Sequence, residues 1–211
     1  MNYSHEVVER RSINAKPSRA VVLPKKDERW SYVMEGYLRK RGLPYKLAVS
    51  NGWYPSLDKE GVVRIVIPAT SLVNSWPYYQ ARATDSRNRT RYLSPACPRG
   101  DALSVLYPPD EILGVVIVEG PMDALAAAEC GYIGVGLMGN RPNDLVLTHL
   151  KSYLKNEREC LVIPDSDALS EGAAICGALW KEGYECFCKP LRGYKDLAEM
   201  PLGERKEFLW E

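Results

Sequence analysis

The second half of the chain alternates between short apolar runs and segments of helical character, and this alternation constrains the fold most strongly. The apolar run VVIV (115–118) leads into PMDALAAAECG, an alanine-rich stretch that favours a helix ending at Gly131. Strands that alternate with such helices predict a parallel sheet with right-handed crossovers. We expect an α/β fold here, with strands at 115–118, 132–139, 159–164 and 185–191 and helices at 121–131, 142–155 and 171–184.

The first half has a different organisation. Its first 28 residues are polar and basic and predict a loosely held arm. Apolar residues then recur at helical spacing in WSYVMEGYLRKR (30–41) and predict a helix. Short strand-like runs separated by turn-forming residues predict a small antiparallel α+β unit. These runs are 62–68, 78–83 and 91–95.

Charge divides the chain in the same place. Residues 1–110 contain 18 Lys+Arg and 10 Asp+Glu, a balance of +8, whereas residues 111–211 contain 10 and 17, a balance of −7. This asymmetry predicts one module that faces a polyanion and another that collects acids. We expect a flexible basic arm (1–28), a basic N-terminal subdomain (29–110), an α/β domain (111–205) and a tail (206–211).

Composition excludes several classes of protein. No apolar run is long enough for a membrane span, and the N-terminus lacks the apolar core of a signal peptide, so we expect a cytoplasmic protein with no membrane partner. The six cysteines form no CxxC pair and are expected to be reduced thiols. Because only His5 and His149 are present, neither a histidine metal site nor a histidine-centred triad is expected.

Carboxylates follow three of the predicted strands. Glu119 comes after the first, Asp165 and Asp167 after the third, and Asp196 after the fourth. The carboxyl ends of parallel strands meet at one edge, where crowded carboxylates would repel one another. A divalent cation removes that repulsion, so the pattern predicts a site for Mg²⁺ (or Mn²⁺). Asp123, one helical turn beyond Glu119, could face the same side.

This order of motifs resembles the Toprim domain, which is shared by bacterial-type primases, topoisomerases of types IA and II, and several nucleases. The matching elements are the Glu-Gly after one apolar strand, the Asp-Ser-Asp after another, and the Lys-Asp beyond a third. The string VEGPMDALAA is similar to the primase version, V-E-G-x-x-D, and Asp123 fills its last position. The resemblance implies a Toprim fold, a Rossmann-like parallel sheet, over residues 111–205.

The first half is similar to the same branch. YLRKRGLPYKLA (37–48) resembles the helix that precedes the primase polymerase core, and QARA, RYLSPACP and LSVLYPPDEIL resemble the series that follows it. By position, Arg82 and Arg91 would contact phosphates, while Arg87 and Arg89 lie in the intervening turn without a motif match. A row of guanidiniums suits a phosphodiester backbone or a triphosphate. The chain is thus identified as similar to the polymerase core of bacterial and phage (DnaG-type) primases.

The resemblance implies a primase-like core that makes short primers on single-stranded DNA from nucleoside triphosphates, by two-metal nucleotidyl transfer. A separate replicative helicase is a candidate partner, and neither a zinc module nor a helicase domain is expected in the chain. The implied catalytic residues are Glu119, Asp165 and Asp167. The implied metal ligands are Glu119, Asp123, Asp165, Asp167 and Asp196, and the implied nucleic-acid or nucleotide contacts are Arg82, Arg87, Arg89 and Arg91.

The sequence departs from the primase pattern at three places, and one of them is Pro164, which directly precedes Asp165 and makes the metal loop atypical. The small residues expected directly after Asp167 come later, so a helix capped by Ser170 is expected there. The tandem acids near the end are reduced to Asp196, with Glu199 as a substitute. Two other functions stay open: a metal-dependent nuclease, which uses the same acids, and a non-catalytic single-stranded-DNA-binding accessory factor.

Overall fold

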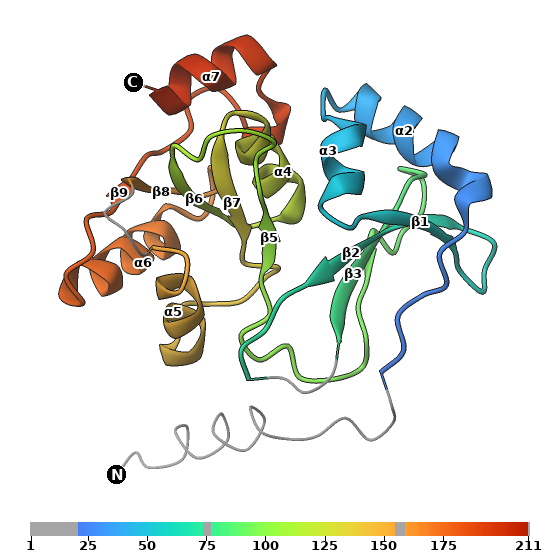
Figure 1. Cartoon of the computed structure of the whole chain (residues 1–211), viewed down its shortest axis with the longest axis horizontal. Coiled ribbons are helices and arrows are strands. Elements are labelled where there is room, and N and C mark those ends of the chain that lie inside the picture. The colour runs from blue at the N-terminus through green and yellow to red at the C-terminus, as the bar shows by residue number, and fades with distance from the viewer. Residues whose placement is uncertain (1–20, 74–76, 155–158, 211) are drawn as a thin grey trace.

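Two sheets lie side by side in the computed structural model, which describes residues 21–73, 77–154 and 159–210 (Figure 1). The elements are, in chain order, η1 (Glu28–Trp30), α2 (Ser31–Lys40), α3 (Tyr45–Ser50), β1 (Tyr54–Leu57), β2 (Val63–Ala69), β3 (Tyr78–Ala83), β4 (Tyr92–Leu93), β5 (Ser104–Leu106), β6 (Gly114–Val118), α4 (Pro121–Glu129), β7 (Tyr132–Gly136), α5 (Asp144–Lys151), β8 (Glu159–Ile163), α6 (Leu169–Lys181), β9 (Phe187–Cys188), η2 (Leu197–Glu199) and α7 (Leu202–Trp210).

The first sheet is antiparallel, in the order β1-β2-β3-β4, as the alternating runs of the first half predict. Ile65 and Ile67 of β2 are fully buried and belong to the same core as Met34 and Leu38 of α2. The apolar stripe of α2, noted at helical spacing in the sequence, is therefore buried against this sheet.

The second sheet has the order β5-β7-β6-β8-β9, and β6 to β9 run parallel. The predicted α/β fold is confirmed. Along β6, Val116 and Val118 face the core that contains α4, whereas Val115 and Ile117 face the core that contains α5 and α6. A strand with helices on both faces must be apolar on both sides, which explains the unbroken run GVVIV.

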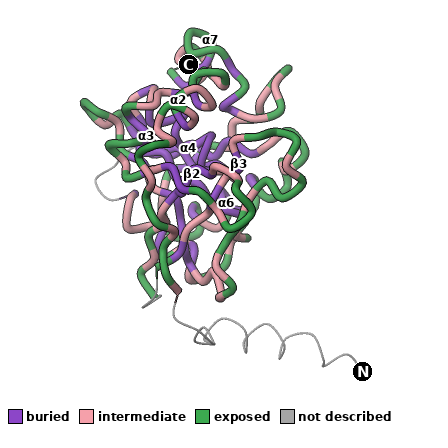
Figure 2. The backbone as a smooth tube through the Cα atoms, turned by 90° about the vertical axis from the view of Figure 1, so that its right-hand side faces the viewer, coloured by how far each residue is buried: buried purple, intermediate pink, exposed green. Residues whose placement is uncertain are grey.

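Helix α4 lies at the centre of the molecule, as Figure 2 shows, and all its residues except Glu129 are buried. Its small side chains let β7 approach very closely. A Cβ atom at Gly134 would stand only 1.9 Å from the Ala124 carbonyl oxygen. The core on this face is continuous with the core of the first sheet, so both halves of the chain share it.

Several boundaries differ from those expected. Helix α6 begins at Leu169 with Ala168 as its N-cap, and Ser170 is a first-turn residue, not the cap. The reason is packing: Gly172 lies so close to Pro164 that a Cβ atom would come within 2.8 Å of the ring, which fixes the first turn of α6 against the end of β8. The strand expected at 185–191 is reduced to Phe187–Cys188.

The outer segments also differ. β5 joins the second sheet, antiparallel to β7, although the sequence places it in the N-terminal subdomain. The expected tail (206–211) is, as far as Trp210, the second half of α7, and it is held because Leu209 is buried and its carbonyl accepts a hydrogen bond from the Tyr132 hydroxyl. Most of the expected arm (1–28) lies outside the described residues. Among the described helices, none combines the length and apolarity that a membrane span needs.

Candidate active site

Glu119 and Asp165 meet at the carboxyl edge of the second sheet. They follow β6 and β8, which are neighbouring parallel strands with Val118 opposite Ile163. The backbone N–H of Asp165 lies near the Glu119 carboxylate and favours its charged form. Burial raises the pKa of Glu119, and the nearby Asp167 and Glu171 charges raise it further. The edge therefore gathers acids from both strands.

A third segment reaches the same place. The backbone N–H of Ser166 donates to the Lys195 carbonyl at 3.1 Å, which ties the loop after β8 to the loop that carries Asp196. Asp196 caps η2 by accepting a hydrogen bond of 2.9 Å from the Glu199 backbone N–H. The exposed Glu199 accepts a hydrogen bond from the Lys195 N–H at 3.3 Å, so it lies one turn from Asp196.

Asp123 lies beneath this edge, on the first turn of α4, and is only 7% exposed. Its Oδ1 accepts a hydrogen bond of 2.9 Å from the Ala198 backbone N–H, just beyond Asp196. Burial, and next the Asp196 charge, raise the pKa of Asp123 to about 7, although the hydrogen bond from Ala198 opposes this. Asp123 therefore lies near the acids of the three loops, on the side of the sheet that α4 covers.

Asp165 is the centre of this acidic group. Burial is the largest cause that raises its pKa, to about 6, followed by the charges of Glu119, Asp196 and Asp167. Lys195 opposes the rise. Asp167 is exposed, beside the group rather than inside it. Three neighbouring carboxylates thus oppose the ionisation of Asp165, and a cation bound there would relieve this repulsion.

The residues suit a cation held partly by other ligands. Within the described ranges, no three His, Cys, Asp or Glu side chains are arranged so that they could hold a metal ion by themselves. Mg²⁺ does not need such a cage, because it is commonly bound by one or two carboxylates together with water and substrate phosphates. The buried Oε1 of Glu119 has no hydrogen-bond partner among the described residues and offers one free ligand atom. The donor set therefore fits Mg²⁺ or Mn²⁺.

The first sheet holds an arginine between two tyrosine rings near Asp123. The Arg82 guanidinium lies 4.7 Å from the centre of the Tyr92 ring and 6.0 Å from that of Tyr37. Burial raises the pKa of Tyr92, and the Asp123 charge contributes to the rise, so Tyr92 lies near both Arg82 and Asp123. Two aromatic rings thus hold Arg82, and one of them, Tyr92, lies near Asp123 of the acidic group.

The other three arginines lie elsewhere on that sheet. Arg87 is in the turn between β3 and β4 and pairs with Asp85, with 2.9 Å between Nη2 and Oδ2. Arg89 and Arg91 are exposed on the same turn and at its end. The structure therefore links Arg82 to the acids through Tyr92, whereas Arg87, Arg89 and Arg91 are exposed in and after the turn between β3 and β4. A role of these arginines in binding nucleic acid stays a prediction.

Two basic residues of the site were not assigned from the sequence. Arg41, at the C-terminal end of α2, lowers the pKa of Asp123, and Lys195 lowers that of Asp165, although other influences outweigh both. Both belong to motifs that were matched, the RGL after the first helix and the Lys-Asp before η2. The motifs that contain Arg41 and Lys195 were visible in the sequence, but only the fold shows that these two residues lie near the acids.

Comparison with known proteins identifies the fold. The chain matches a phage T7 primase fragment with a TM-score of 0.61 and 18% identity, over 98% of this chain and 84% of that one. It matches the zinc-binding and RNA polymerase domains of the Aquifex aeolicus primase with a TM-score of 0.61 and 17% identity. The fold is that of a DnaG-type primase catalytic core.

The primase-core fold is supported by a further structure, the Escherichia coli primase catalytic core, with a TM-score of 0.58 and 16% identity over 85% of this chain and 76% of that one. No protein-family model matches the chain, and no curated protein sequence matches it. The match to the Aquifex aeolicus protein covers 83% of this chain but only 54% of that one, so this chain spans about half its length.

Proposed function

We propose that this protein is the catalytic core of a primase, which joins nucleoside triphosphates into short primers on single-stranded DNA. The observation that carries the proposal is the meeting of Glu119, Asp165, Asp196 and Asp123 at one sheet edge, with Arg82 held on the ring of Tyr92, which lies near Asp123. Acids alone suit several kinds of phosphate chemistry. An arginine held beside them suits a reaction that must bind a triphosphate and a nucleic-acid backbone together.

Mg²⁺ or Mn²⁺, when bound, supplies the activation of the attacking hydroxyl and the neutralisation of the leaving pyrophosphate. Asp165 and Asp167 hold the ions in this proposal, with Asp196 assisting. Glu119 completes the site as a ligand or a proton acceptor, and Asp123 supports it from α4. Arg82 and the exposed Arg87, Arg89 and Arg91 bind the phosphates of template or nucleotide.

Similar structures support the proposed partners. One is a DnaG primase catalytic domain bound to single-stranded DNA, and another contains phage T7 primase domains bound to an RNA/DNA hybrid and dTTP. The phage T7 fragment belongs to a primase-helicase protein, which supports a replicative helicase as a further partner.

The test is an incubation of the protein with single-stranded DNA, labelled nucleoside triphosphates and Mg²⁺ or Mn²⁺. Short template-dependent products are expected. Asp165→Asn should lower their yield at least about 100-fold, because it removes a metal ligand worth several kcal/mol. Arg82→Gln should lower it about tenfold or more, through the loss of charge-assisted hydrogen bonds.

Matched controls make the same chemical changes outside the site. Glu207→Gln alters an exposed acid of α7, and Arg29→Gln alters an exposed arginine that pairs with Asp27. Both should leave the yield within about twofold of the wild type, since exposed pairs contribute little. Shortened DNA in place of primers would instead identify a nuclease, and DNA binding without any product would identify an accessory factor.

A further inference from the structure

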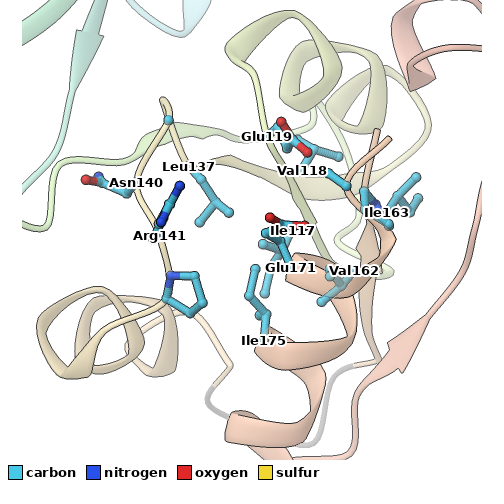
Figure 3. A pocket seen from close by; sticks show the side chains of 15 residues that line it. Ile117, Val118, Glu119, Leu137, Asn140, Arg141, Val162, Ile163, Glu171 and Ile175 are labelled. Atoms are coloured by element: carbon cyan, nitrogen blue, oxygen red, sulfur yellow. The ribbon is translucent and has the colours of Figure 1, made fainter. Parts of the chain in front are cut away.

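A cavity of about 210 Å³ opens beside Glu119, on the face of the sheet opposite to α4. It lies between the ends of β6 and β8, with the loop before α5 (137–142) on one side and the first half of α6 on the other (Figure 3). The helix after β6 covers one face of the sheet and the helix after β8 covers the other. Parallel sheets of this kind bind ligands where the helices change face in this way.

The inner walls of the cavity are apolar. Ile117, Leu137, Val162 and Ile175 line it, and each is at most 5% exposed to solvent. The cavity is smaller than the roughly 300–1,000 Å³ of pockets that hold whole small-molecule ligands, which suits a bicyclic ring system rather than a whole nucleotide. A flat heteroaromatic ring between aliphatic side chains would bury its faces here without losing hydrogen bonds, since ring faces make none.

The mouth of the cavity is polar and has both signs of charge. Arg141, in the turn before α5, faces Glu171, in the first turn of α6, across the opening (Figure 3). The Arg141 charge acts on the Glu171 carboxylate, which shows that the two are near each other. Glu119 adds its buried, unpaired Oε1 to the lining. The opening thus offers donors on one side and acceptors on the other.

Purine bases present the complementary pattern. Guanine offers O6 and N7 as acceptors beside N–H donors, and adenine offers N7 beside its amino group. An arginine fits the acceptors and a carboxylate fits the donors. Glu119 belongs both to this cavity and to the acidic edge, so a ring bound here directs an attached sugar and phosphates toward the proposed metal ligands.

We propose that this cavity binds the purine base of a nucleotide, with Arg141 and Glu171 as the residues that recognise it. The identification of that nucleotide as a substrate rests on the proposed function. Binding of the base does not, because it needs neither metal nor DNA, and this independence allows the two proposals to be tested separately.

The test is methyl NMR of the whole chain, titrated with adenosine, guanosine, cytidine and uridine in the presence of EDTA. Purine nucleosides should shift the methyl signals of Ile117, Val162 and Ile175, while Leu209, in the core on the other side of the sheet, stays unchanged. Pyrimidine nucleosides should bind at least about fivefold more weakly. Ribose 5-phosphate, which has no base, should give no shift at these methyls.

Two variants test the recognition. Arg141→Met and Glu171→Gln should each weaken purine binding about fivefold, the loss of about one hydrogen bond. Lys181→Met and Glu182→Gln make comparable charge changes at the far, exposed end of α6 and should have no effect. Unshifted cavity methyls, equal binding of pyrimidines, or equal binding by Arg141→Met and wild type would each overturn the proposal.

The outcome is separable from that of the primase proposal. Purine shifts in a protein that makes no primers would leave the cavity proposal standing and reject the proposed function. Primer synthesis by a protein whose cavity methyls do not respond to purines would support the proposed function and reject the cavity proposal. In Asp165→Asn the purine shifts should persist although synthesis is lost, because Asp165 does not line the cavity.

Discussion

At the scale of single residues, Asp123 is a buried carboxyl group that destabilises the folded protein when it ionises. It is nearly buried, accepts one backbone hydrogen bond from Ala198, and has a pKa raised to about 7 by burial and by Asp196. The folded state therefore favours its protonated form. Between the unfolded pKa of 3.8 and the folded value of about 7, the folded protein binds more protons, so stability falls as the pH rises through this window.

Asp123→Asn removes this titration but keeps an oxygen for the Ala198 N–H. From pH 5 to pH 8, the wild type loses stability over about the two pH units below the folded pKa of Asp123, whereas the variant does not. The free energy of unfolding of the variant, relative to that of the wild type, should therefore rise by about 2–3 kcal/mol over this range. Urea unfolding at both pH values in EDTA measures the difference. Glu207→Gln, on the exposed face of α7, is the control and should show no pH-dependent gain. A stability difference that is the same at both pH values would contradict the assignment.

At the scale of elements, the contact between α4 and β7 decides where the acidic edge lies, since α4 carries Asp123 and follows Glu119 directly. The contact depends on glycine: a Cβ at Gly134 would meet the Ala124 carbonyl at 1.9 Å, and one at Gly136 would meet the Gly120 carbonyl at 2.9 Å. Backbone atoms on both sides cannot move aside as a flexible side chain can.

Gly134→Ala should therefore destabilise the protein by at least about 3 kcal/mol. Gly177→Ala is the matched substitution on α6, where a Cβ would find nothing within 4 Å. The free energy of unfolding of that variant should rise by about 0.5–1 kcal/mol, because alanine lowers the entropy of the unfolded chain. Thermal and urea unfolding of both variants measure these effects. A Gly134→Ala protein as stable as the wild type would show that α4 and β7 are not packed as described.

At the scale of the whole molecule, the site connects segments that are far apart in the chain. The acids come from the ends of β6 and β8 and from the loop before η2, and the arginines come from α2 and β3 of the other half. A cation bound among the acids would therefore hold several loops together and stabilise the whole fold. This effect can be measured without any assay of activity.

Added Mg²⁺ should raise the free energy of unfolding by about 2.7 kcal/mol at a concentration 100 times its dissociation constant. The gain should be lost in Asp165→Asn. It should also shrink from pH 7.5 to pH 5, because the pKa of Asp165 is raised to about 6 and below that value a proton competes with the ion. Thermal unfolding with NaCl at matched ionic strength is the control. Equal stabilisation of the wild type and Asp165→Asn would argue against the assigned ligand.

Local pattern predicted most elements of this fold. β3 spans the predicted residues 78–83, and β6 and α4 begin within a residue of the expected positions, because apolar periodicity and the Gly120-Pro121 break are local signals. The edge strand β5, the start of α6 and the helical end of the chain were missed. Each of these depends on a distant partner: β7 for β5, Pro164 for Gly172, and Tyr132 for Leu209.

The sequence by itself determined which residues form strands, that acids stand at three strand ends, and that the two halves differ in charge, since all of these are properties of neighbouring residues. Only the tertiary structure decided that Asp123 lies near Asp196, that Arg41 and the Arg82–Tyr92 pair lie near Asp123, and that a cavity opens beside Glu119 on the face of the sheet opposite to α4. Those relations depend on strand order and on the close packing of α4 against β7, which no short stretch of sequence encodes.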